Sequence, residues 1–263
     1  MNIVFDIGGT NMRVASAEGT TLGEIRKVPT SKGPDEGIAE FVTLAKELSK
    51  GAVIHTIAGC VAGNVSNGGV ISDARNLGAW QGMNIKHALS TALGAPVFVF
   101  NDAALAGVGE AHIGAGRGSR IVVYITVSTG VGGARIVEGQ IDISGGVGHT
   151  SVRGTNLEDL VSGTAVKKKF GIEPKELVSI DERTILADVL AEGLVEITKK
   201  WTPDTIVLGG SMIVGVNPIP IDRVQKTLAS LIPDPPNVKM AELKDNGGLI
   251  GAAILAAQNQ LQG

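Results

Sequence analysis

The sequence is poor in the residues that build cross-links, thiolate metal sites and nucleic-acid surfaces. Only one of its 263 residues is a cysteine, Cys60, which excludes a disulfide framework and a multi-thiolate zinc site. Acidic side chains outnumber basic ones, 26 to 23, which disfavours a surface for nucleic acid or an anionic membrane. No apolar run approaches the roughly 20 residues that cross a bilayer, and no charged-then-apolar leader opens the chain. We therefore expect a cytoplasmic protein with no nucleic-acid or membrane partner.

Strand-like and helix-like segments alternate along the chain, which predicts an α/β protein. Strands are predicted at 2–6, 12–17, 22–28, 52–58, 96–100, 120–127, 134–137, 204–208 and 237–243. Helices are predicted at 35–50, 84–93, 103–112, 156–170, 184–200, 222–231 and 248–260. Glycine is abundant, with 37 residues, which indicates many tight turns or close approaches of backbone to a ligand.

The order of elements at the start of the chain recurs further along. A strand, a Gly-rich turn, a second strand and a second turn occupy the first 20 residues, and the same order returns at 121–139. This repeat predicts two domains built on one strand order, with a cleft between them, at 1–100 plus 248–263 and at 101–247. The alternative is that two strand–glycine–strand hairpins recur by chance.

The first Gly-rich turn is a candidate phosphate site. Gly8 and Gly9 allow backbone N–H groups to approach a phosphate closely, and the side chains of Thr10 and Asn11 add donors. Asp6, just before the turn, can hold Mg²⁺ through water against the phosphates. The alternative is an ordinary hairpin turn. The Walker pattern is absent, which excludes a P-loop.

Two later Gly-rich turns have the same physical character. Thr129 and Gly130, within 126–133, form a second candidate phosphate cradle. Gly209 and Gly210 follow an apolar strand and suit an adenine or ribose lying against bare backbone. An ordinary strand-to-helix turn is the alternative for the last pair.

Four further residues carry polar side chains at positions that suit an active site. Asn101 and Asp102 lie where a buried strand meets a helix, a placement typical of active sites in α/β folds. A helix cap is the alternative for Asp102, and the two roles are compatible. His149 and Glu158 are uninformative singly, because a lone His is usually a surface residue and a carboxylate suits a first helical turn.

The order of these motifs resembles the repressor–ORF–kinase (ROK) family of sugar kinases and transcription factors. The resemblance runs from Asn2 to Ala253. Its most specific segments are Asp6-Ile7-Gly8-Gly9-Thr10-Asn11, Asn101-Asp102-Ala103-Ala104, Gly109-Glu110, Thr129-Gly130-Val131-Gly132-Gly133, Gly148-His149, Leu157-Glu158, Ser162-Gly163 and Ile206-Val207-Leu208-Gly209-Gly210. It implies a two-domain actin-like ATPase fold (ribonuclease H-like, shared by heat-shock ATPases and sugar kinases) with an interdomain cleft, and ATP- and Mg²⁺-dependent phosphorylation of a sugar hydroxyl.

The same resemblance implies a role for each candidate residue. Asp102 would be the general base that takes the proton of the sugar hydroxyl. Asn101, His149 and Glu158 would hold other sugar hydroxyls. The phosphate-binding residues would be Gly8, Gly9, Thr10, Thr129 and Gly130, with Gly209 and Gly210 facing adenosine. A homodimer is also implied.

The chain departs from the family pattern in three places. Gly146 stands where the Gly-Glu-x-Gly-His motif has a sugar-binding Glu, which leaves the sugar and the phosphorylated hydroxyl undetermined. The family's cysteine-rich zinc loop is missing between His149 and Glu158, so no structural zinc is expected. Ser128 replaces the glycine that usually precedes the Thr-Gly turn.

Three other functions are alternatives to a sugar kinase. A nucleotide- or sugar-binding pseudokinase or sensor of the same fold is favoured by Gly146 and opposed by Asp102. A DNA-binding repressor needs a helix-turn-helix ahead of the phosphate motif, which here begins at Asp6, so we do not expect one. Kinases resembling type III pantothenate kinases carry Gly-Asn-Thr where this chain has Gly8-Gly9-Thr10, so that function ranks last.

Overall fold

The structure, a computed structural model, describes residues 1–74 and 77–260, and the chain divides into two compact units. Unit 1 comprises Met1–Gly109 and Asp245–Gly263, and unit 2 comprises Glu110–Lys244. The boundary expected after residue 100 lies nine residues later, after Gly109, because most of the helix that follows residue 101 packs with unit 1. The boundary expected after residue 247 lies three residues earlier, after Lys244.

Unit 1 is built on a five-stranded sheet in the order β3-β2-β1-β4-β7. The strands are β1 (Asn2–Ile7), β2 (Asn11–Glu18), β3 (Thr21–Pro29), β4 (Thr56–Val61) and β7 (Val97–Asn101). β1 pairs antiparallel with β2 and parallel with β4, which pairs parallel with β7. The apolar β1 and β4 are almost wholly buried, as expected of central strands, whereas the charged β3 is an exposed edge. A small hairpin, β5 (Asn64–Val65) and β6 (Ile71–Asp73), and the short helix η1 (Gly78–Trp80) follow β4.

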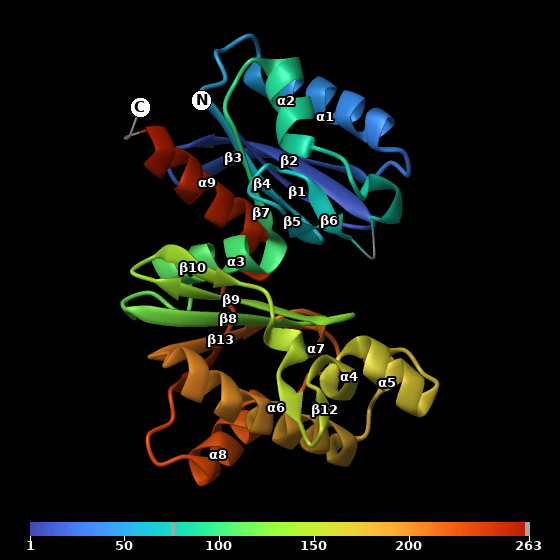
Figure 1. Cartoon of the computed structure of the whole chain (residues 1–263), viewed down its shortest axis with the longest axis vertical. Helices are drawn as coiled ribbons and strands as arrows, with labels where there is room; N and C mark the ends of the chain where they lie inside the picture. The colour runs from blue at the N-terminus through green and yellow to red at the C-terminus, as the bar shows by residue number, and fades with distance from the viewer. Residues whose placement is uncertain (75–76, 261–263) are drawn as a thin grey trace. The chain divides into compact units, whose positions relative to one another are not determined.

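Four α-helices belong wholly or mostly to unit 1: α1 (Pro34–Ser49), α2 (Ile85–Leu93), α3 (Asp102–His112) and α9 (Gly247–Gln260). The closing helix α9 packs against β1 and β4, as Figure 1 shows. It also lies close to α3. Glycine at position 251 makes this possible, since a Cβ there would collide with the Leu105 carbonyl oxygen. The core on the α1 side contains Phe5 and Phe41, whose rings meet edge to face with centroids 5.2 Å apart.

Unit 2 repeats the sheet of unit 1. Its order is β10-β9-β8-β13-β14, with strands β8 (Ile121–Val127), β9 (Val131–Val137), β10 (Gln140–Ser144), β13 (Thr205–Gly209) and β14 (Asn237–Met240). As in unit 1, the first strand pairs antiparallel with the second and parallel with the fourth. The internal repeat predicted from the sequence is therefore confirmed.

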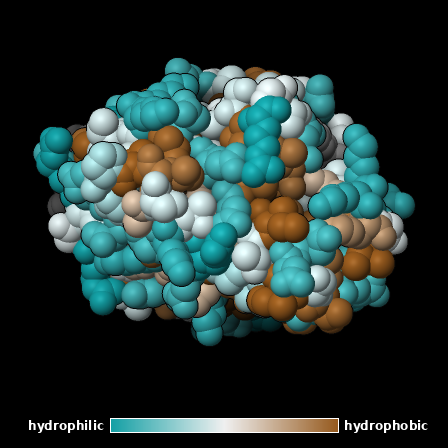
Figure 2. All heavy atoms as spheres, turned by 90° about the horizontal axis from the view of Figure 1, so that it is seen from below, coloured by the Kyte–Doolittle hydropathy of each residue, from teal (hydrophilic) through white to brown (hydrophobic). Residues whose placement is uncertain are grey.

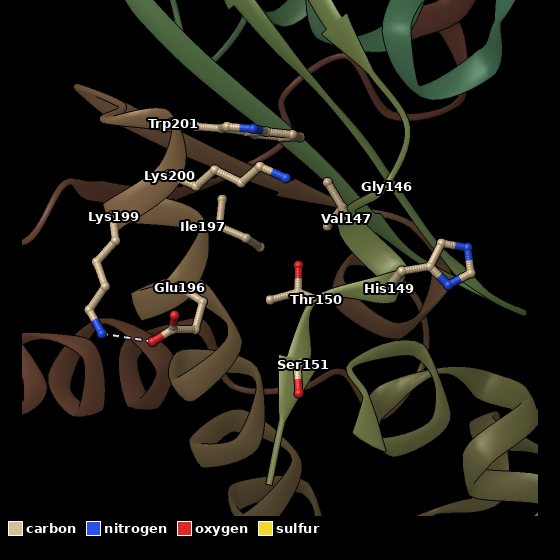
Figure 3. Close-up of a pocket in the computed structure, with 10 residues that line it drawn as sticks. All are labelled: Gly146, Val147, His149, Thr150, Ser151, Glu196, Ile197, Lys199, Lys200 and Trp201. Carbon is tan, nitrogen blue, oxygen red and sulfur yellow. Dashed lines mark hydrogen bonds and ion pairs between the residues drawn. The ribbon is translucent and has the colours of Figure 1, made fainter. Parts of the chain in front are cut away.

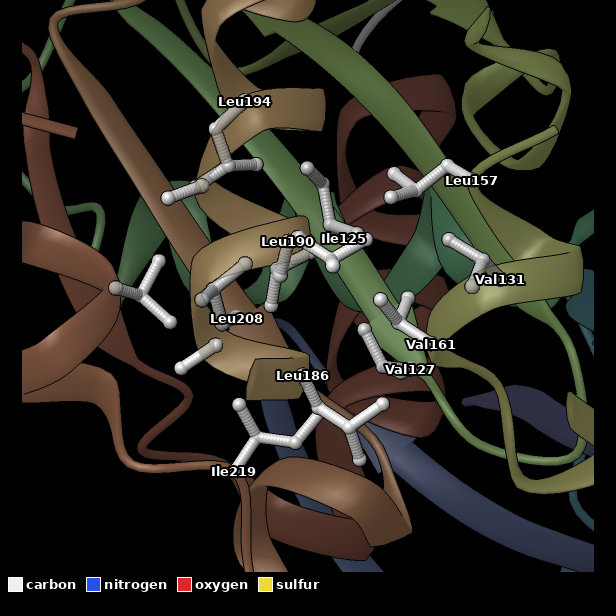
Figure 4. Packing of buried hydrophobic residues seen from close by; sticks show 14 of the residues in the cluster. Ile125, Val127, Val131, Leu157, Val161, Leu186, Leu190, Leu194, Leu208 and Ile219 are labelled. Carbon is white, nitrogen blue, oxygen red and sulfur yellow. The ribbon is translucent and has the colours of Figure 1, made fainter. Parts of the chain in front are cut away.

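The helices of unit 2 cover this sheet on the side of its main core. They are α4 (Glu158–Val161), α5 (Gly163–Phe170), α6 (Ile180–Trp201), α7 (Ser211–Val214) and α8 (Ile221–Leu231), with the short helices η2 (Val147–His149), η3 (Pro174–Glu176) and η4 (Lys244–Asn246) and the hairpin β11 (Ser151–Val152) and β12 (Thr155–Asn156). Leu186, Leu190 and Leu194 recur every four residues on α6 and pack into the core with Ile125 and Val127 of β8 (Figure 4).

The predicted helix at 156–170 is wrong as one element. It is interrupted at Ser162, whose backbone is extended and whose Oγ accepts a hydrogen bond from Ala165 N at 3.1 Å, so α4 ends and α5 begins there. The strand predicted at 52–58 lies instead at Thr56–Val61. It continues through Gly59 because the missing Cβ at that position leaves room for the Phe5 ring.

The surface is mixed in character. Figure 2 shows hydrophobic atoms in separate groups among hydrophilic ones. The most exposed large hydrophobic side chains are Val53, Val178 and Val216. In the part of the chain that the structure describes, no helix is both long enough and apolar enough to span a membrane.

Candidate active site

Two carboxylates of unit 1 stand at the same edge of its sheet. Asp6 is near the end of β1, and Asp102 begins α3 directly after β7. β1, β4 and β7 are parallel neighbours, so their carboxyl ends meet at one edge, where ligands of α/β folds are usually bound. The two carboxylates are close enough that the charge of Asp6 affects the titration of Asp102.

The Asp102 carboxyl has the properties of a general base. Burial, reinforced by the negative charge of Asp6, raises its pKa to about 6, although hydrogen bonds from Ala103 and Asn101 oppose the shift. Its Oδ1 accepts from Ala103 N at 2.9 Å, but Asp102 is already the first residue of α3, and the capping bond comes from Asn101, whose Oδ1 accepts from the same N–H. A carboxylate with this pKa remains mostly ionised at neutral pH and is a stronger base than an ordinary aspartate.

The Asn101 amide is held at both ends. Its Nδ2 donates to the Gly63 carbonyl at 3.0 Å, and its Oδ1 accepts from Ala103 N at 3.0 Å. These bonds fix the turn from β7 into α3 and so fix the position of Asp102. The direct contact of Asn101 with a sugar stays a prediction.

Sequence reasoning missed Arg13. It lies opposite Asp6 in the β1–β2 register, and its guanidinium forms an ion pair with the Asp6 carboxylate. The hairpin register could have revealed it, since Asp6 and Arg13 are equally spaced from the turn. Cys60, beside Asp6 on β4, is fully buried, and burial and both carboxylates raise the pKa of its thiol well above the usual value. A thiol so protonated is a poor nucleophile.

The first Gly-rich turn is a tight hairpin with exposed backbone at its tip. Gly8 N donates to Asn11 O at 2.9 Å, and the Thr30 hydroxyl donates to Gly8 O at 2.7 Å. Gly9 and Thr10 are exposed. The backbone is thus that of an ordinary hairpin turn. Phosphate binding by this turn stays a prediction.

The second Gly-rich turn, between β8 and β9, is anchored from two directions. Gly163 N donates to Ser128 O at 2.7 Å, and the Thr164 hydroxyl donates to Thr129 O at 2.7 Å, so the start of α5 fixes the turn. Glu158 Oε2 accepts from Val131 N at 2.9 Å.

Glycine makes the Glu158 contact possible. A Cβ at Gly130 would lie 2.5 Å from Glu158 Oε2, and a Cβ at Gly148 would lie 2.5 Å from the Val131 carbonyl oxygen. The Glu158 carboxylate, which the resemblance gives to the sugar, is therefore in direct contact with the β8–β9 turn, which it gives to the phosphates.

The third Gly-rich turn lies beside the second. The Ser128 Oγ accepts from Ser211 N at 3.0 Å. Gly210 has φ +87°, and a Cβ there would lie 2.6 Å from Ser128 Oγ. Only glycine fits both the left-handed backbone and the space, which leaves bare backbone at this edge of unit 2.

Gly146 precedes the short helical turn η2, and His149 is the last residue of that turn. His149 is exposed. Gly146 has φ +82°, and a Cβ there would meet no atom within 4 Å. The space beside the position where the family has a carboxylate is thus open.

The structure assembles the predicted residues into two groups, one in each unit. Unit 1 carries Asp6, Gly8, Gly9, Thr10, Asn11, Asn101 and Asp102, and unit 2 carries Thr129, Gly130, His149, Glu158, Gly209 and Gly210. Among the described residues, no group of three or more His, Cys, Asp or Glu side chains could hold a metal ion. The expected absence of structural zinc and the expected homodimer stay predictions.

Comparison with known proteins decides the family. The ROK family profile matches residues 2–259. The chain belongs to the ROK family. The resemblance inferred from the motifs is confirmed, and with it the actin-like ATPase fold.

Three relatives illustrate the membership. The bifunctional enzyme NanE/NanK of Brucella melitensis is 31% identical over 97% of this chain, which spans about half (54%) of that enzyme. The ROK hexokinase of Thermus thermophilus is 26% identical, with a TM-score of 0.88 over 100% of this chain and 99% of its own. A ROK glucokinase of Streptomyces griseus, solved with glucose and AMPPNP, shares the fold with a TM-score of 0.79 at 24% identity over 98% and 99% of the two chains.

Proposed function

We propose that this ROK protein is an ATP-dependent kinase that phosphorylates a sugar hydroxyl, with Asp102 as the general base. The observation that carries the proposal is the Asp102 carboxyl at the ligand-binding edge of the unit 1 sheet, with a pKa near 6. Phosphoryl transfer depends mainly on positioning and charge stabilisation, with a carboxylate that orients and deprotonates the nucleophile.

Each residue has a role that its surroundings support. Asp102 accepts the proton of the attacking hydroxyl, and Asn101 holds the turn that presents Asp102. Glu158 and His149 bind other hydroxyls of the sugar. Because Glu158 also accepts from Val131 N, the sugar is held against the turn that binds the phosphates.

The glycine turns fit a nucleotide phosphate. Gly9 and Thr10 are exposed residues, and Gly130 and Gly210 lie where a side chain would collide with its neighbours. ATP supplies the phosphoryl group. Mg²⁺, when bound, neutralises the charge on its phosphates.

Asp6 fits water-mediated rather than direct contact with Mg²⁺. A carboxylate oxygen is a ligand that Mg²⁺ accepts, but Asp6 Oδ2 is already paired with the Arg13 guanidinium. That pairing lowers the net negative charge that Asp6 presents.

The names of the relatives support the reaction class. The Thermus protein is a hexokinase, and the Streptomyces griseus glucokinase was solved with glucose and an ATP analogue. They do not fix the sugar, because Gly146 differs from the family motif at a sugar-binding position. A pseudokinase or sensor remains the alternative that Gly146 favours.

A panel of hexoses, amino sugars and N-acetylated sugars tests the proposal. Each sugar is incubated with the protein, ATP and Mg²⁺, and sugar-dependent ADP release is measured. At least one sugar should be turned over at a kcat of about 1–100 s⁻¹, the range of kinases. Saturable binding of sugar and ATP with no turnover of any sugar would establish the pseudokinase instead.

A further inference from the structure

Unit 2 contains a cavity that borders the proposed sugar site, because Gly146 and His149 are among its lining residues. It has a volume of about 610 Å³ and lies between the C-terminal end of α6 and the segment 146–151. Ile197, Lys200 and Trp201 line it from α6, and Val147, Thr150 and Ser151 line it from the other side (Figure 3). Cavities that hold small metabolites have volumes of about 300–1,000 Å³, so this one is large enough.

The Lys200 ammonium is available to a ligand. Figure 3 shows its side chain extending into the space between Trp201 and Val147. Within the described parts of the chain, Lys200 has no ion-pair or hydrogen-bond partner. Lys199 also lines the cavity but differs, because its Nζ pairs with Glu196 Oε1 at 2.7 Å (Figure 3).

The other polar groups of the lining are mostly donors. Thr150 and Ser151 contribute hydroxyls. The Trp201 indole N–H is buried and lacks a hydrogen-bond partner among the described residues, so it is not one of the donors that face the cavity. The one carboxylate of the lining, Glu196, is already occupied by Lys199. A ligand rich in acceptor oxygens therefore suits the cavity better than a cation.

The negative pole of α6 is an opposing factor, since helix C-termini disfavour anions. Arg135 satisfies one carbonyl there, because its Nε donates to the Trp201 carbonyl oxygen at 2.9 Å, while its Nη1 pairs with Asp142. With two lysines and one glutamate, the lining carries one net positive charge.

We propose that this cavity is a second ligand site that binds a phosphomonoester. Lys200 and Thr150 donate to the phosphate oxygens, and Val147 and Ile197 contact the organic part. The proposed phosphate donors, Lys200 and Thr150, have no part in the proposed kinase reaction, although the cavity shares Gly146 and His149 with the proposed sugar site. A bound ligand would therefore contact the η2 turn, which ends at His149.

Calorimetric titration of the full chain tests the site with three probes: inorganic phosphate, glucose 6-phosphate and ADP. The variants are Lys200→Met and Lys168→Met, which removes the same charge from an exposed position of α5 that does not line the cavity. Loss of a charge-assisted hydrogen bond should weaken binding about tenfold or more in Lys200→Met. Lys168→Met should leave the Kd within about twofold, the effect of an exposed charge.

The fluorescence of Trp201 supplies an independent readout. The second tryptophan, Trp80, is buried in unit 1, so a ligand in the cavity should alter mainly the emission of Trp201. The change should vanish in Trp201→Phe. Any of the three probes that binds with this signature supports the site. The probe that binds tightest identifies the source of the phosphate as free anion, sugar ester or nucleotide.

Two results would overturn the proposal. One is the absence of saturable, Lys200-dependent binding of every probe up to about 10 mM, beyond the millimolar Kd of a weak site. The other is equal weakening by Lys168→Met and Lys200→Met, which would indicate general surface charge rather than a site. If glucose 6-phosphate and ADP bind only at the catalytic residues, their Kd values should be the same for the wild type and for Lys200→Met.

Discussion

At the scale of single residues, the burial of the Asp102 carboxyl has opposite effects on basicity and on stability. Burial beside Asp6 raises its pKa to about 6 and makes it a better base, but burial of that charge also destabilises the folded protein. Functional sites commonly carry such a cost in stability.

The cost predicts a pH-dependent effect of Asp102→Asn on stability. The pKa of Asp102 is raised in the folded state, so the folded protein binds more protons than the unfolded one between pH 3.8 and about 6. The stability that Asp102 contributes is complete below that window and is lost as the pH rises through it. Asn does not titrate, so the free energy of unfolding of Asp102→Asn relative to wild type should increase across the window, by up to about 3 kcal/mol.

Denaturant unfolding at pH 4.5 and pH 8 measures this difference. Asp222→Asn is the matched control, because Asp222 also lies in a first helical turn but is exposed. Its effect should be similar at both pH values. A difference between Asp102→Asn and wild type that stays constant with pH would contradict the raised pKa.

Gly146 is the residue at which sequence reasoning located the main departure from the family. The structure adds what the sequence could not: the backbone there has φ +82°, and the space around it is open. A side chain is thus tolerated sterically but strained by about 1–2 kcal/mol in the left-handed region.

We predict that Gly146→Glu shifts the sugar preference toward glucose, because it restores a carboxylate that accepts hydrogen bonds from hydroxyls. Gly145→Glu is the matched control, since Gly145 has φ +87° and equally open surroundings. Both variants should lose similar stability, and only Gly146→Glu should change the ranking of kcat/KM among sugars. An unchanged ranking, or the same change in both variants, would show that position 146 does not set specificity.

At the scale of elements, the sequence predicted the repeating hairpins better than the helix boundaries. The strand–glycine–strand pattern could be recognised in the sequence because apolar strands and paired glycines are local signals. The break at Ser162 could not be recognised, because the segment 156–170 is amphipathic throughout. Its interruption depends on the Ser162 cap and on the hydrogen bond from Gly163 to the β8–β9 turn. The Asp6–Arg13 pair was also missed, although the equal spacing of the two residues from the Gly-rich turn is visible in the sequence.

Ser128 connects two of these elements. Its Oγ accepts from Ser211 N and so holds the β8–β9 turn against the turn that follows β13. We predict that Ser128→Ala raises the KM for ATP about three- to tenfold, the effect of one lost hydrogen bond, with the KM for sugar nearly unchanged. Steady-state kinetics measure this split.

Ser144→Ala serves as the control, because Ser144 is an exposed residue at the end of β10 in the same unit. A KM for ATP that is unchanged in Ser128→Ala would show that the two turns hold their positions without this bond.

At the scale of the whole molecule, each unit is a copy of one five-stranded plan, and each contributes one set of candidate residues. The sequence predicted the plan and most of both sets, because the motifs follow strand ends. It did not predict the cavity beside α6, which depends on how the last turn of a long helix packs against a segment about 50 residues earlier. Contacts of that kind leave no local pattern in a sequence.

The central claim is that Asp102 deprotonates a sugar hydroxyl as it receives a phosphoryl group from ATP. The most direct test is the turnover of Asp102→Asn on the best sugar of the panel at pH 8, followed by the ³¹P NMR signal of the sugar phosphate. The wild type should form sugar phosphate and ADP in equal amounts. Asp102→Asn should lower kcat by at least about 100-fold, while calorimetry shows that ATP and sugar still bind. Near-normal turnover by Asp102→Asn would contradict the account.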